Sequence, residues 1–352
     1  MAEVSALDRR RAATWTPPDR YQRVVTVDGH TGGEPFRVVV SGAPAIPGDT
    51  MVAKRAWALA HLDELRRILM WEPRGHADMY GCFLTEPVSP GADFGVLFMH
   101  NDGFSTMCGH GIIAIATTAI TTGMVPSAGV VTPLGIDTPA GLVRAEARQV
   151  GDRIERVEFV NVPSFVDRLD QVVDVPAVGR VRYDLASGGA YYAYVDAPAL
   201  GMALEPAASE RLIDVGRAIK RAVMASGPIR HPTTPDLGFL YGTIFVGPAS
   251  RPSSHSRHVC IFANGELDRS PTGTGVSARL AILAARGELA PGRRITIESI
   301  LGSEFGGTIV GTATLGEKSG IVPRVDGEAH LVGRSEFWID GEDALGGGFL
   351  LR

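Results

Sequence analysis

Hydrophobic and polar positions along the chain follow two alternating patterns. Short apolar runs bounded by glycine, proline or polar turns predict β-strands, beginning with residues 24–27 and 36–40. Two longer segments, 50–69 and 210–226, carry apolar residues at helical spacing with charged residues between them, and they predict amphipathic helices. Because proline and glycine recur at short intervals between the strands, the pattern favours mixed or mostly antiparallel sheet over a doubly wound parallel sheet.

One part of this pattern occurs twice, 164 positions apart. In each copy a strand-like run leads through a short turn into Gly-x-Gly, and then into a helix with many small side chains, residues 111–122 and 276–286. Placing Cys108 on Thr272 superimposes four further pairs of identical residues, Gly109 with Gly273, Gly111 with Gly275, Ala114 with Ala278, and Gly123 with Gly287. The last pair stands where a left-handed residue closes a helix. The sequence therefore predicts two related halves, one with a thiol at its helix start and the other with a hydroxyl.

The boundary between the halves is predicted near residue 185. Residues 187–196 resemble the opening hairpin around residues 32–38, as if the same topology started again. We therefore expect a first half over 21–185 and a second half over 186–352, and the sequence leaves open whether the last residues rejoin the first half. Residues 1–20 lack the apolar core of a signal peptide and are expected to form a loose leader.

Composition narrows the class of protein. A length of 352 residues favours about two domains, and 45% apolar with 21% charged residues is typical of a globular protein. With a net charge of −5 and no basic stripe, a nucleic-acid partner is not expected, and no apolar run approaches the ~20 residues that span a membrane. Three cysteines cannot form a paired disulfide framework, so we expect a reducing compartment and a cytoplasmic protein.

The two Gly-x-Gly turns suggest a binding site for a carboxylate. The first amide groups of a helix have no partner within it and carry a partial positive charge. Two such helix starts that converge could hold one carboxylate from both sides, and the same field should lower the pKa of the Cys108 thiol and make it a base. The alternative is an inert buried thiol, which is how we interpret Cys82 and Cys260, since both lie inside strand-like apolar runs.

Other residues near the turns have a structural and a functional interpretation. His110 could cap its helix or contact a ligand, and Asp268 could cap its turn or receive a substrate ammonium group. Phe98 and Phe262, which coincide under the 164-residue offset, could be core residues or walls of a pocket.

Nucleotide and metal cofactors are not expected. Both turns match the Gly-x-Gly-x-x-Gly/Ala pattern of dinucleotide sites, but the first acidic residue after Gly109 is Asp137, which is too distant for a ribose contact. His30, His76 and His110 are far apart in sequence and lack the spacing of metal ligands.

Four motifs together resemble the proline racemase family. They are Met-Cys-Gly-His at 107–110, Asp-Arg-Ser-Pro-Thr-Gly-Thr-Gly at 268–275, and the segments 28–35 and 74–81. The resemblance implies the diaminopimelate-epimerase-like α/β fold, in which two pseudo-symmetric halves each wrap a mixed sheet around a central helix. It also implies a cofactor-independent enzyme with a catalytic thiol at Cys108, and it is compatible with a homodimer. The implied substrate-binding residues are Gly109, His110, Asp268, Gly273 and Thr274, with Tyr80, Phe98 and Phe262 as candidate pocket walls.

One departure from the family pattern bears on the activity. Racemases and epimerases of the family carry a second cysteine where this chain has Thr272. An alcohol has a pKa near ~15.7 against ~8.5 for a thiol, so an alkoxide base costs roughly 10 kcal/mol more. The resemblance of the threonine-bearing branch therefore implies dehydration of trans-3-hydroxy-L-proline, with Cys108 and Thr272 as the catalytic pair. Racemisation of proline, 2-epimerisation of 4-hydroxyproline, NAD-dependent oxidoreduction and an inactive amino-acid-binding protein are the alternatives.

Overall fold

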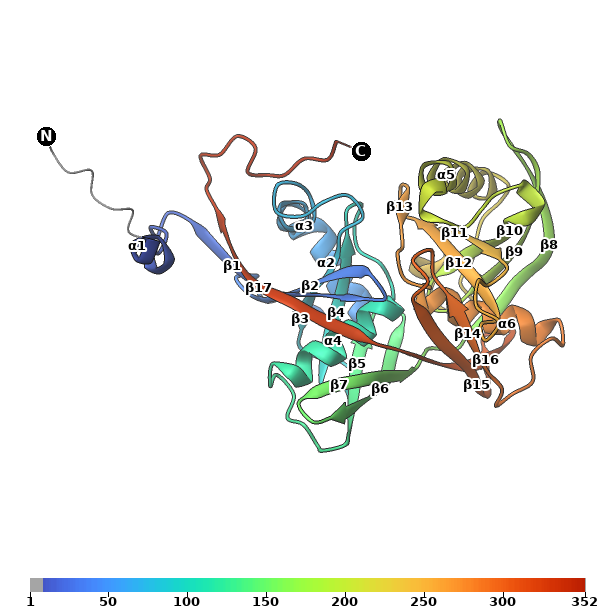
Figure 1. The fold of residues 1–352 in the computed structure, drawn as a ribbon, viewed down its shortest axis with the longest axis horizontal. Coiled ribbons are helices and arrows are strands. Elements are labelled where there is room, and N and C mark those ends of the chain that lie inside the picture. Colours follow the sequence, from blue (N-terminus) through green and yellow to red (C-terminus); the bar gives the residue numbers. More distant parts are fainter. Residues whose placement is uncertain (1–8, 352) are drawn as a thin grey trace, which may run out of the picture.

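The computed structural model describes residues 9–351, which form two lobes connected by long strands (Figure 1). Each lobe is built on strands that curve around one central helix. Of the predicted leader, residues 1–8 lie outside the described part. The remainder begins with the short helix α1 (Arg9–Thr14), and the ring of Trp15 packs edge-on against Trp338 with 5.0 Å between centroids.

The first lobe is a mixed sheet. In order of pairing, its strands are β17 (Ala329–Ile339), β1 (Gln22–Thr31), β2 (Glu34–Ser41), β3 (Tyr80–Thr85), β4 (Phe94–His100), β5 (Val131–Thr138), β6 (Gly141–Val150) and β7 (Arg153–Val160). Only the pairs β2–β3 and β4–β5 are parallel.

The second lobe repeats this scheme. Its strands pair in the order β8 (Phe165–Val175), β9 (Gly179–Ser187), β10 (Tyr191–Asp196), β11 (Leu240–Gly247), β12 (Ser256–Phe262), β14 (Arg294–Glu298), β15 (Glu304–Leu315) and β16 (Lys318–Gly327), with β13 (Glu266–Leu267) added beside β12. From β9 to β16 the succession of parallel and antiparallel pairs is the same as from β1 to β7. The predicted fold class, mixed α/β with two pseudo-symmetric halves, is confirmed.

The strand pairing β16–β7 and the chain segment from β16 to β17 connect the lobes. Strand β17 returns to the first lobe and pairs with β1 from Gln22↔Ile339 to Thr31↔Ala329, and β16 pairs with β7. Strand β9 pairs with β8 on one side and with β10 on the other, so the chain enters the second lobe between β7 and β8. The division into 21–185 and 186–352 remains a prediction, and the resemblance between the hairpins, on which it rests, begins at β10 and does not include the two strands before it.

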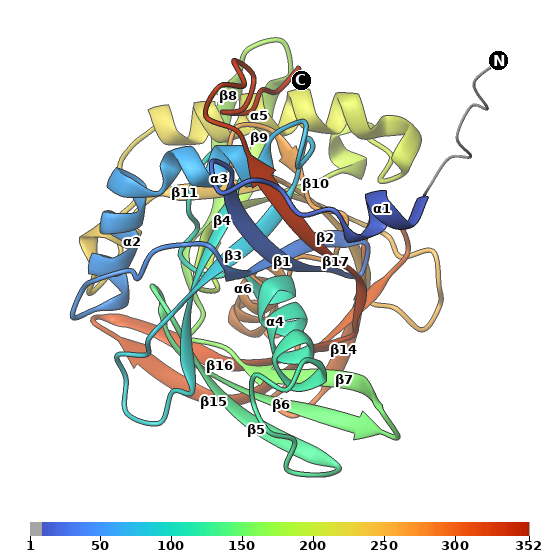
Figure 2. The same ribbon diagram turned by 90° about the vertical axis from the view of Figure 1, so that its left-hand side faces the viewer.

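The central helices are α4 (Gly109–Thr121) and α6 (Gly273–Ala285), each of 13 residues (Figure 2). All residues of α4 from Gly109 to Ile120 are buried, which explains the small and apolar side chains of this helix. Both helices begin earlier than predicted because the glycines of the Gly-x-Gly turns already have helical conformation.

The amphipathic helices lie on the outside of the lobes. The prediction for 210–226 is confirmed by α5 (Ser209–Ala225), whereas the segment 50–69 forms two helices, α2 (Met51–His61) and α3 (Asp63–Met70), with a break at Leu62. Short 3-10 turns complete the chain at η1 (Pro198–Leu200), η2 (Pro206–Ala208) and η3 (Pro235–Leu237).

One hydrophobic cluster surrounds both α4 and α6 and is continuous between the lobes. Separate clusters lie beneath α2 and α3 in the first lobe and beneath α5 in the second. Within residues 9–351, no helix combines the length and apolar character needed to cross a bilayer.

Candidate active site

The two central helices meet at their N-terminal ends. A Cβ atom added to Gly109 would lie 2.5 Å from Cα of Gly273, and one added to Gly273 would lie 2.7 Å from Cα of Gly109. Only glycine permits this approach, because both obstructing atoms belong to the backbone. Helical hydrogen bonding starts at the amides of Ile112 and Val276, so the preceding amide groups of both helices point toward the junction without a partner inside their helix.

Cys108 is the N-cap of α4. Its backbone is extended (φ −145°, ψ 111°), and its Sγ accepts a hydrogen bond from the amide of Gly111 at 3.2 Å. The His110 ring lies against the same sulfur, with Nδ1 at 3.3 Å and Nε2 at 3.5 Å. Burial lowers the pKa of His110 to about 3, so this imidazole is neutral at physiological pH.

The ionisation of Cys108 differs from the sequence-based expectation. Burial raises the pKa of the thiol well above its ordinary value, while the hydrogen bond from Gly111 lowers it and the neighbouring Asp268 raises it. The expected lowering of this pKa is therefore wrong for the closed structure, because the desolvation of the thiolate exceeds the effect of one amide group.

Thr272 occupies the equivalent position before α6 but is held differently. Its backbone has φ +64°, a conformation that costs energy for a β-branched residue, and its side chain does not cap the helix. Instead its hydroxyl donates to Oδ2 of Asp268 at 2.7 Å, and Oδ1 of Asp268 accepts from the amide of Ser270 at 2.7 Å. Burial raises the pKa of Asp268 to about 6, although these hydrogen bonds oppose the shift.

Cys108 and Thr272 line the same small cavity. Its free volume is about 10 Å³, enough for about one water molecule. The lobes must therefore open before a substrate can enter. The lining residues are Tyr80, Met107, Cys108, Gly109, His110, Tyr192, Tyr241, Cys260, Phe262, Asp268, Thr272, Gly273 and Thr274.

Phe98 is the one predicted site residue that this cavity does not include. It is fully buried behind Gly111, where a Cβ atom on that glycine would lie 2.6 Å from the Phe98 ring. Of the two interpretations of Phe98, this position favours the core residue over the pocket wall, whereas its counterpart Phe262 lines the cavity. The two helix environments are therefore not equivalent in detail.

Four lining residues were not predicted: Met107, Tyr192, Tyr241 and Cys260. The sequence contains a weak indication that Tyr241 belongs to the site, because Tyr241-Gly242 repeats Tyr80-Gly81 at a spacing of 161 residues. It contains no such indication for Cys260, since a cysteine inside an apolar strand is more often a core residue. Within residues 9–351, no three His, Cys, Asp or Glu side chains gather in the way that a metal site requires.

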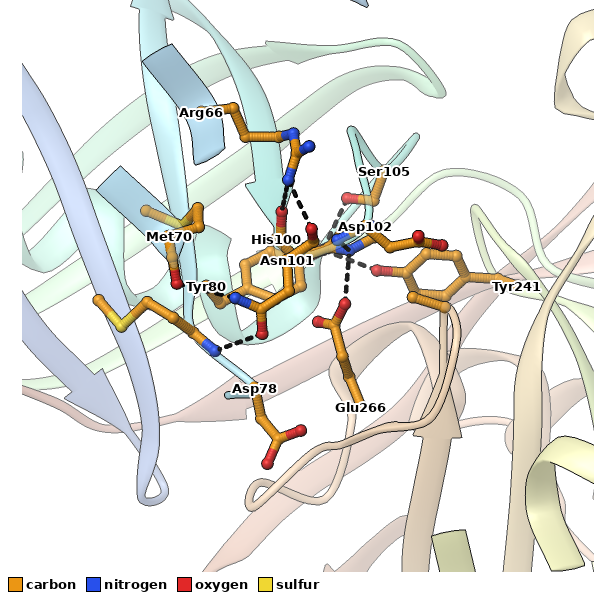
Figure 3. A network of polar contacts seen from close by, with 12 residues as sticks. Arg66, Met70, Asp78, Tyr80, His100, Asn101, Asp102, Ser105, Tyr241 and Glu266 are labelled. Carbon is orange, nitrogen blue, oxygen red and sulfur yellow. Dashed lines mark hydrogen bonds and ion pairs between the residues drawn. The ribbon is translucent and has the colours of Figure 1, made fainter. Parts of the chain in front are cut away.

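Polar contacts hold the lobes together around the cavity. The amide of Arg269 donates to Oε2 of Glu34 at 2.7 Å, and its guanidinium group contacts the Asp78 carboxylate at 3.3 Å. Figure 3 shows two further contacts between the lobes, His100 Nδ1 with Glu266 Oε1 at 3.1 Å and the hydroxyl of Tyr80 with that of Tyr241 at 3.0 Å. These contacts stabilise the closed arrangement.

Comparison with known proteins agrees with this architecture. A trans-3-hydroxy-L-proline dehydratase of Burkholderia cenocepacia is 47% identical over 327 residues, covering 93% of this chain and 98% of that protein. A 3-hydroxyproline 2-epimerase of Burkholderia multivorans is equally similar, at 47% identity over 327 residues with the same coverage.

A solved structure shows the same overall fold. The crystal structure of a hydroxyproline epimerase from Agrobacterium vitis, with bound trans-4-hydroxy-L-proline, matches with a TM-score of 0.90 and 32% identity over 95% of this chain and 96% of that one. The family model described as proline racemase matches residues 26–350 of this chain. The chain, with its paired lobes and facing helix starts, therefore belongs to the proline racemase family.

Proposed function

We propose that this protein removes water from trans-3-hydroxy-L-proline and forms Δ1-pyrroline-2-carboxylate. The main support is the difference between the two helix starts: Cys108 presents a sulfur that accepts a helix amide, whereas Thr272 presents a hydroxyl bound to Asp268. The dehydratase name of a relative with 47% identity supports the same reaction.

In this proposal the substrate carboxylate binds between the helix starts. The amide groups of Gly109 and His110 would reach it from α4, and those of Gly273 and Thr274 from α6. The substrate ammonium group would pair with Asp268, which is buried and carries a negative charge above pH about 6. Tyr80 and Phe262 would pack against the ring.

Substrate binding would also favour ionisation of Cys108. In the closed structure burial raises the pKa of this thiol. A cationic ammonium group within a few ångströms stabilises an anion, and it does so more strongly in a site from which water is excluded. The thiolate would then form in the complex, where it is needed.

The stereochemistry of the substrate suits a single base. In trans-3-hydroxy-L-proline the 3-hydroxyl group and the α-hydrogen lie on the same face of the ring, so a base on that face can begin an elimination without a group opposite. Cys108 removes the α-proton, and the helix amides stabilise the charge that develops on the carboxylate. The 3-hydroxyl group leaves, and the enamine tautomerises to the pyrroline.

Thr272 is a poor second base for inversion at Cα. Forming an alkoxide in place of a thiolate costs roughly 10 kcal/mol, or about ten million-fold in rate if nothing compensates. Its hydroxyl proton is also directed at Asp268. We assign Thr272 to holding Asp268 in place.

The direct test is an NMR assay in D2O with purified protein and trans-3-hydroxy-L-proline, without added metal or nucleotide. Signals of the pyrroline product should replace those of the substrate. Formation of D-proline from L-proline, or of a 4-hydroxyproline epimer, at a higher rate than this dehydration would contradict the assignment. Binding of the substrate without turnover would favour an inactive binding protein.

One observation favours a second activity, 2-epimerisation of 3-hydroxyproline. A relative of 47% identity carries that name, and Cys260 places a thiol on the second-lobe side of the cavity. Burial raises the pKa of Cys260, which suits a proton donor better than a base. In the same assay, cis-3-hydroxy-D-proline would be the product of this reaction, and a Cys260→Ala variant should lose it.

A further inference from the structure

The hydroxyl group of Tyr80 lies at the centre of a buried hydrogen-bond chain beside Cys108. Its Oη contacts Oγ of Ser105 at 2.7 Å and Oη of Tyr241 at 3.0 Å, as Figure 3 shows. Both tyrosines line the cavity, and they are only 2% and 6% exposed. Tyr80 and Cys108 line the same cavity, and the Tyr80 ring packs at 4.7 Å between centroids against the ring of His110, which contacts the Cys108 sulfur. The phenol therefore lies beside the group that we propose as the base.

A local irregularity of strand β11 brings the second phenol to this point. Strands β10 and β11 pair as Tyr191↔Leu240 and Tyr192↔Gly242, so Tyr241 is the extra residue of a β-bulge. Bulges redirect side chains and are frequent beside active sites. Because Tyr80 belongs to the first lobe and Tyr241 to the second, their hydrogen bond forms only when the lobes close.

The proposed elimination needs an acid on the face of the ring that Cys108 occupies. Hydroxide is a poor leaving group unless it is protonated as it departs, and general acids contribute about 10²–10⁴-fold to such steps. Thr272 donates its proton to Asp268, and the Tyr192 hydroxyl is paired with that of Thr274 at 2.7 Å. Burial lowers the pKa of His110, so this residue is a neutral imidazole and lacks the proton of an imidazolium acid. Burial raises the pKa of Tyr80, so its phenol stays protonated.

We propose that Tyr80 is the acid that protonates the departing 3-hydroxyl group, and that Tyr241 and Ser105 are positioning residues that hold its hydroxyl. This inference rests on the proposed dehydration. The Cys108 thiolate takes the α-proton, the C–H electrons form the C2=C3 bond, and the C3–O bond breaks toward oxygen. That oxygen takes the Tyr80 proton and leaves as water. The phenolate then takes the proton from the Cys108 thiol, which restores both groups.

The test compares two leaving groups in the variant Tyr80→Phe. Water loss from trans-3-hydroxy-L-proline is followed by proton NMR, and fluoride loss from trans-3-fluoro-L-proline by fluorine NMR. Fluoride leaves without a proton, so it should not need the phenol. We expect the variant to lose about 100-fold or more in dehydration but less than tenfold in fluoride elimination. Any change in the ionisation of Cys108 affects both substrates equally and cancels in the ratio.

Two further variants serve as controls. Tyr241→Phe removes a positioning contact and should lower the rate of dehydration by about tenfold. Its rate of fluoride elimination should again change much less. Tyr192→Phe removes a cavity phenol bonded to Thr274, and it should change both rates in parallel.

Equal losses with both substrates in Tyr80→Phe, or dehydration at the wild-type rate, would overturn the assignment. A larger and equally selective loss in Tyr241→Phe would transfer the acid role to that residue and contradict this proposal. If wild-type protein eliminated neither group, the proposed function would fail, and this inference with it.

Discussion

The starts of helices α4 and α6 are the most informative regions to compare. Both follow a strand, both begin with Gly-x-Gly, and their glycines touch across the junction. Their N-cap side chains nevertheless point to different partners. The sulfur of Cys108 accepts the amide of Gly111, whereas the hydroxyl of Thr272 turns away from its helix and donates to Asp268.

This difference shows how duplicated architecture can be used for one-sided chemistry. The backbone amides of each helix start can still contact one side of the substrate carboxylate, so substrate binding keeps the pseudo-symmetry of the fold. Proton transfer does not, because only one of the two helix starts carries a thiol, which becomes a base at a lower cost than an alcohol. A site with a base on each side of the substrate can thus become a site with a base on one side through few substitutions.

Removal of the sulfur should have the largest effect. In Cys108→Ser the base becomes an alcohol, at a nominal cost of roughly 10 kcal/mol, so we expect dehydration to fall by at least about 10⁴-fold. The variant should remain folded, as measured by thermal unfolding. Cys82→Ala is the matched control, because this buried thiol of β3 does not line the cavity and its loss should spare the rate. Retention of the wild-type rate in Cys108→Ser would remove this residue from the mechanism.

A thiol at the second helix start should sharpen the comparison. Thr272→Cys would place one thiol at each helix start, so inversion at Cα should become measurable, at least about tenfold above wild type. Chiral chromatography would detect D-proline formed from L-proline. The control Thr272→Ser keeps an alcohol and should gain no such activity, and a gain of the same size in that variant would contradict our explanation.

The glycine contact is predicted to be as important as the side chains beside it. In Gly273→Ala the new Cβ would lie 2.7 Å from backbone Cα of Gly109, so the helix starts must separate. A displacement near 1 Å at a catalytic site costs about 100-fold, and we expect a fall in kcat/KM of this size. Gly341→Ala, at an exposed position with open space, should behave like wild type. Equal behaviour of the two variants would argue against a tight junction.

The dependence of kcat/KM on pH should report the ionisation of Asp268, which holds Thr272 at the second helix start. Burial raises the pKa of Asp268 to about 6, and only the carboxylate attracts the substrate ammonium group. Protonation below pH about 6 therefore weakens binding. Because ionisation of Cys108 also depends on pH, we expect kcat/KM of the wild type to fall about tenfold more between pH 7 and pH 5 than that of Asp268→Asn. The overall rate of Asp268→Asn should be lower, and its pH dependence should be that of the Cys108 thiol alone. The same slope in the variant would assign the pH effect to another group.

The parts of the site that depend on local chemistry could be predicted from the sequence. Gly-x-Gly before a helix with small side chains, repeated at a fixed offset, indicated both Cys108 and Thr272. The mixed sheet and the outer helix near residues 210–226 followed from periodicity, and the α/β class with two pseudo-symmetric halves followed from the family resemblance. A single sequence contains these features because each depends on residue patterns along the chain.

The parts that could not be predicted depend on contacts distant in sequence. The apolar spacing of residues 50–69 continues through Leu62 and hides the break between α2 and α3. Tyr241 reaches the cavity through a bulge that only strand pairing defines. The pKa of Cys108 is set by burial between two lobes, which outweighs the amide group next to it. The position of Phe98 favours a core residue over a pocket wall because the ring packs behind Gly111.

The most direct measurement of one-sided chemistry uses L-proline, which has no 3-hydroxyl group to lose. Wild-type protein is incubated with L-proline in D2O, and deuterium at Cα is followed by NMR together with chiral analysis. We predict that deuterium enters L-proline from the Cys108 side, with D-proline at least about a hundredfold less abundant. Appearance of deuterated D-proline at a comparable rate would show a working proton donor or base on the second-lobe side of the cavity and would contradict the account.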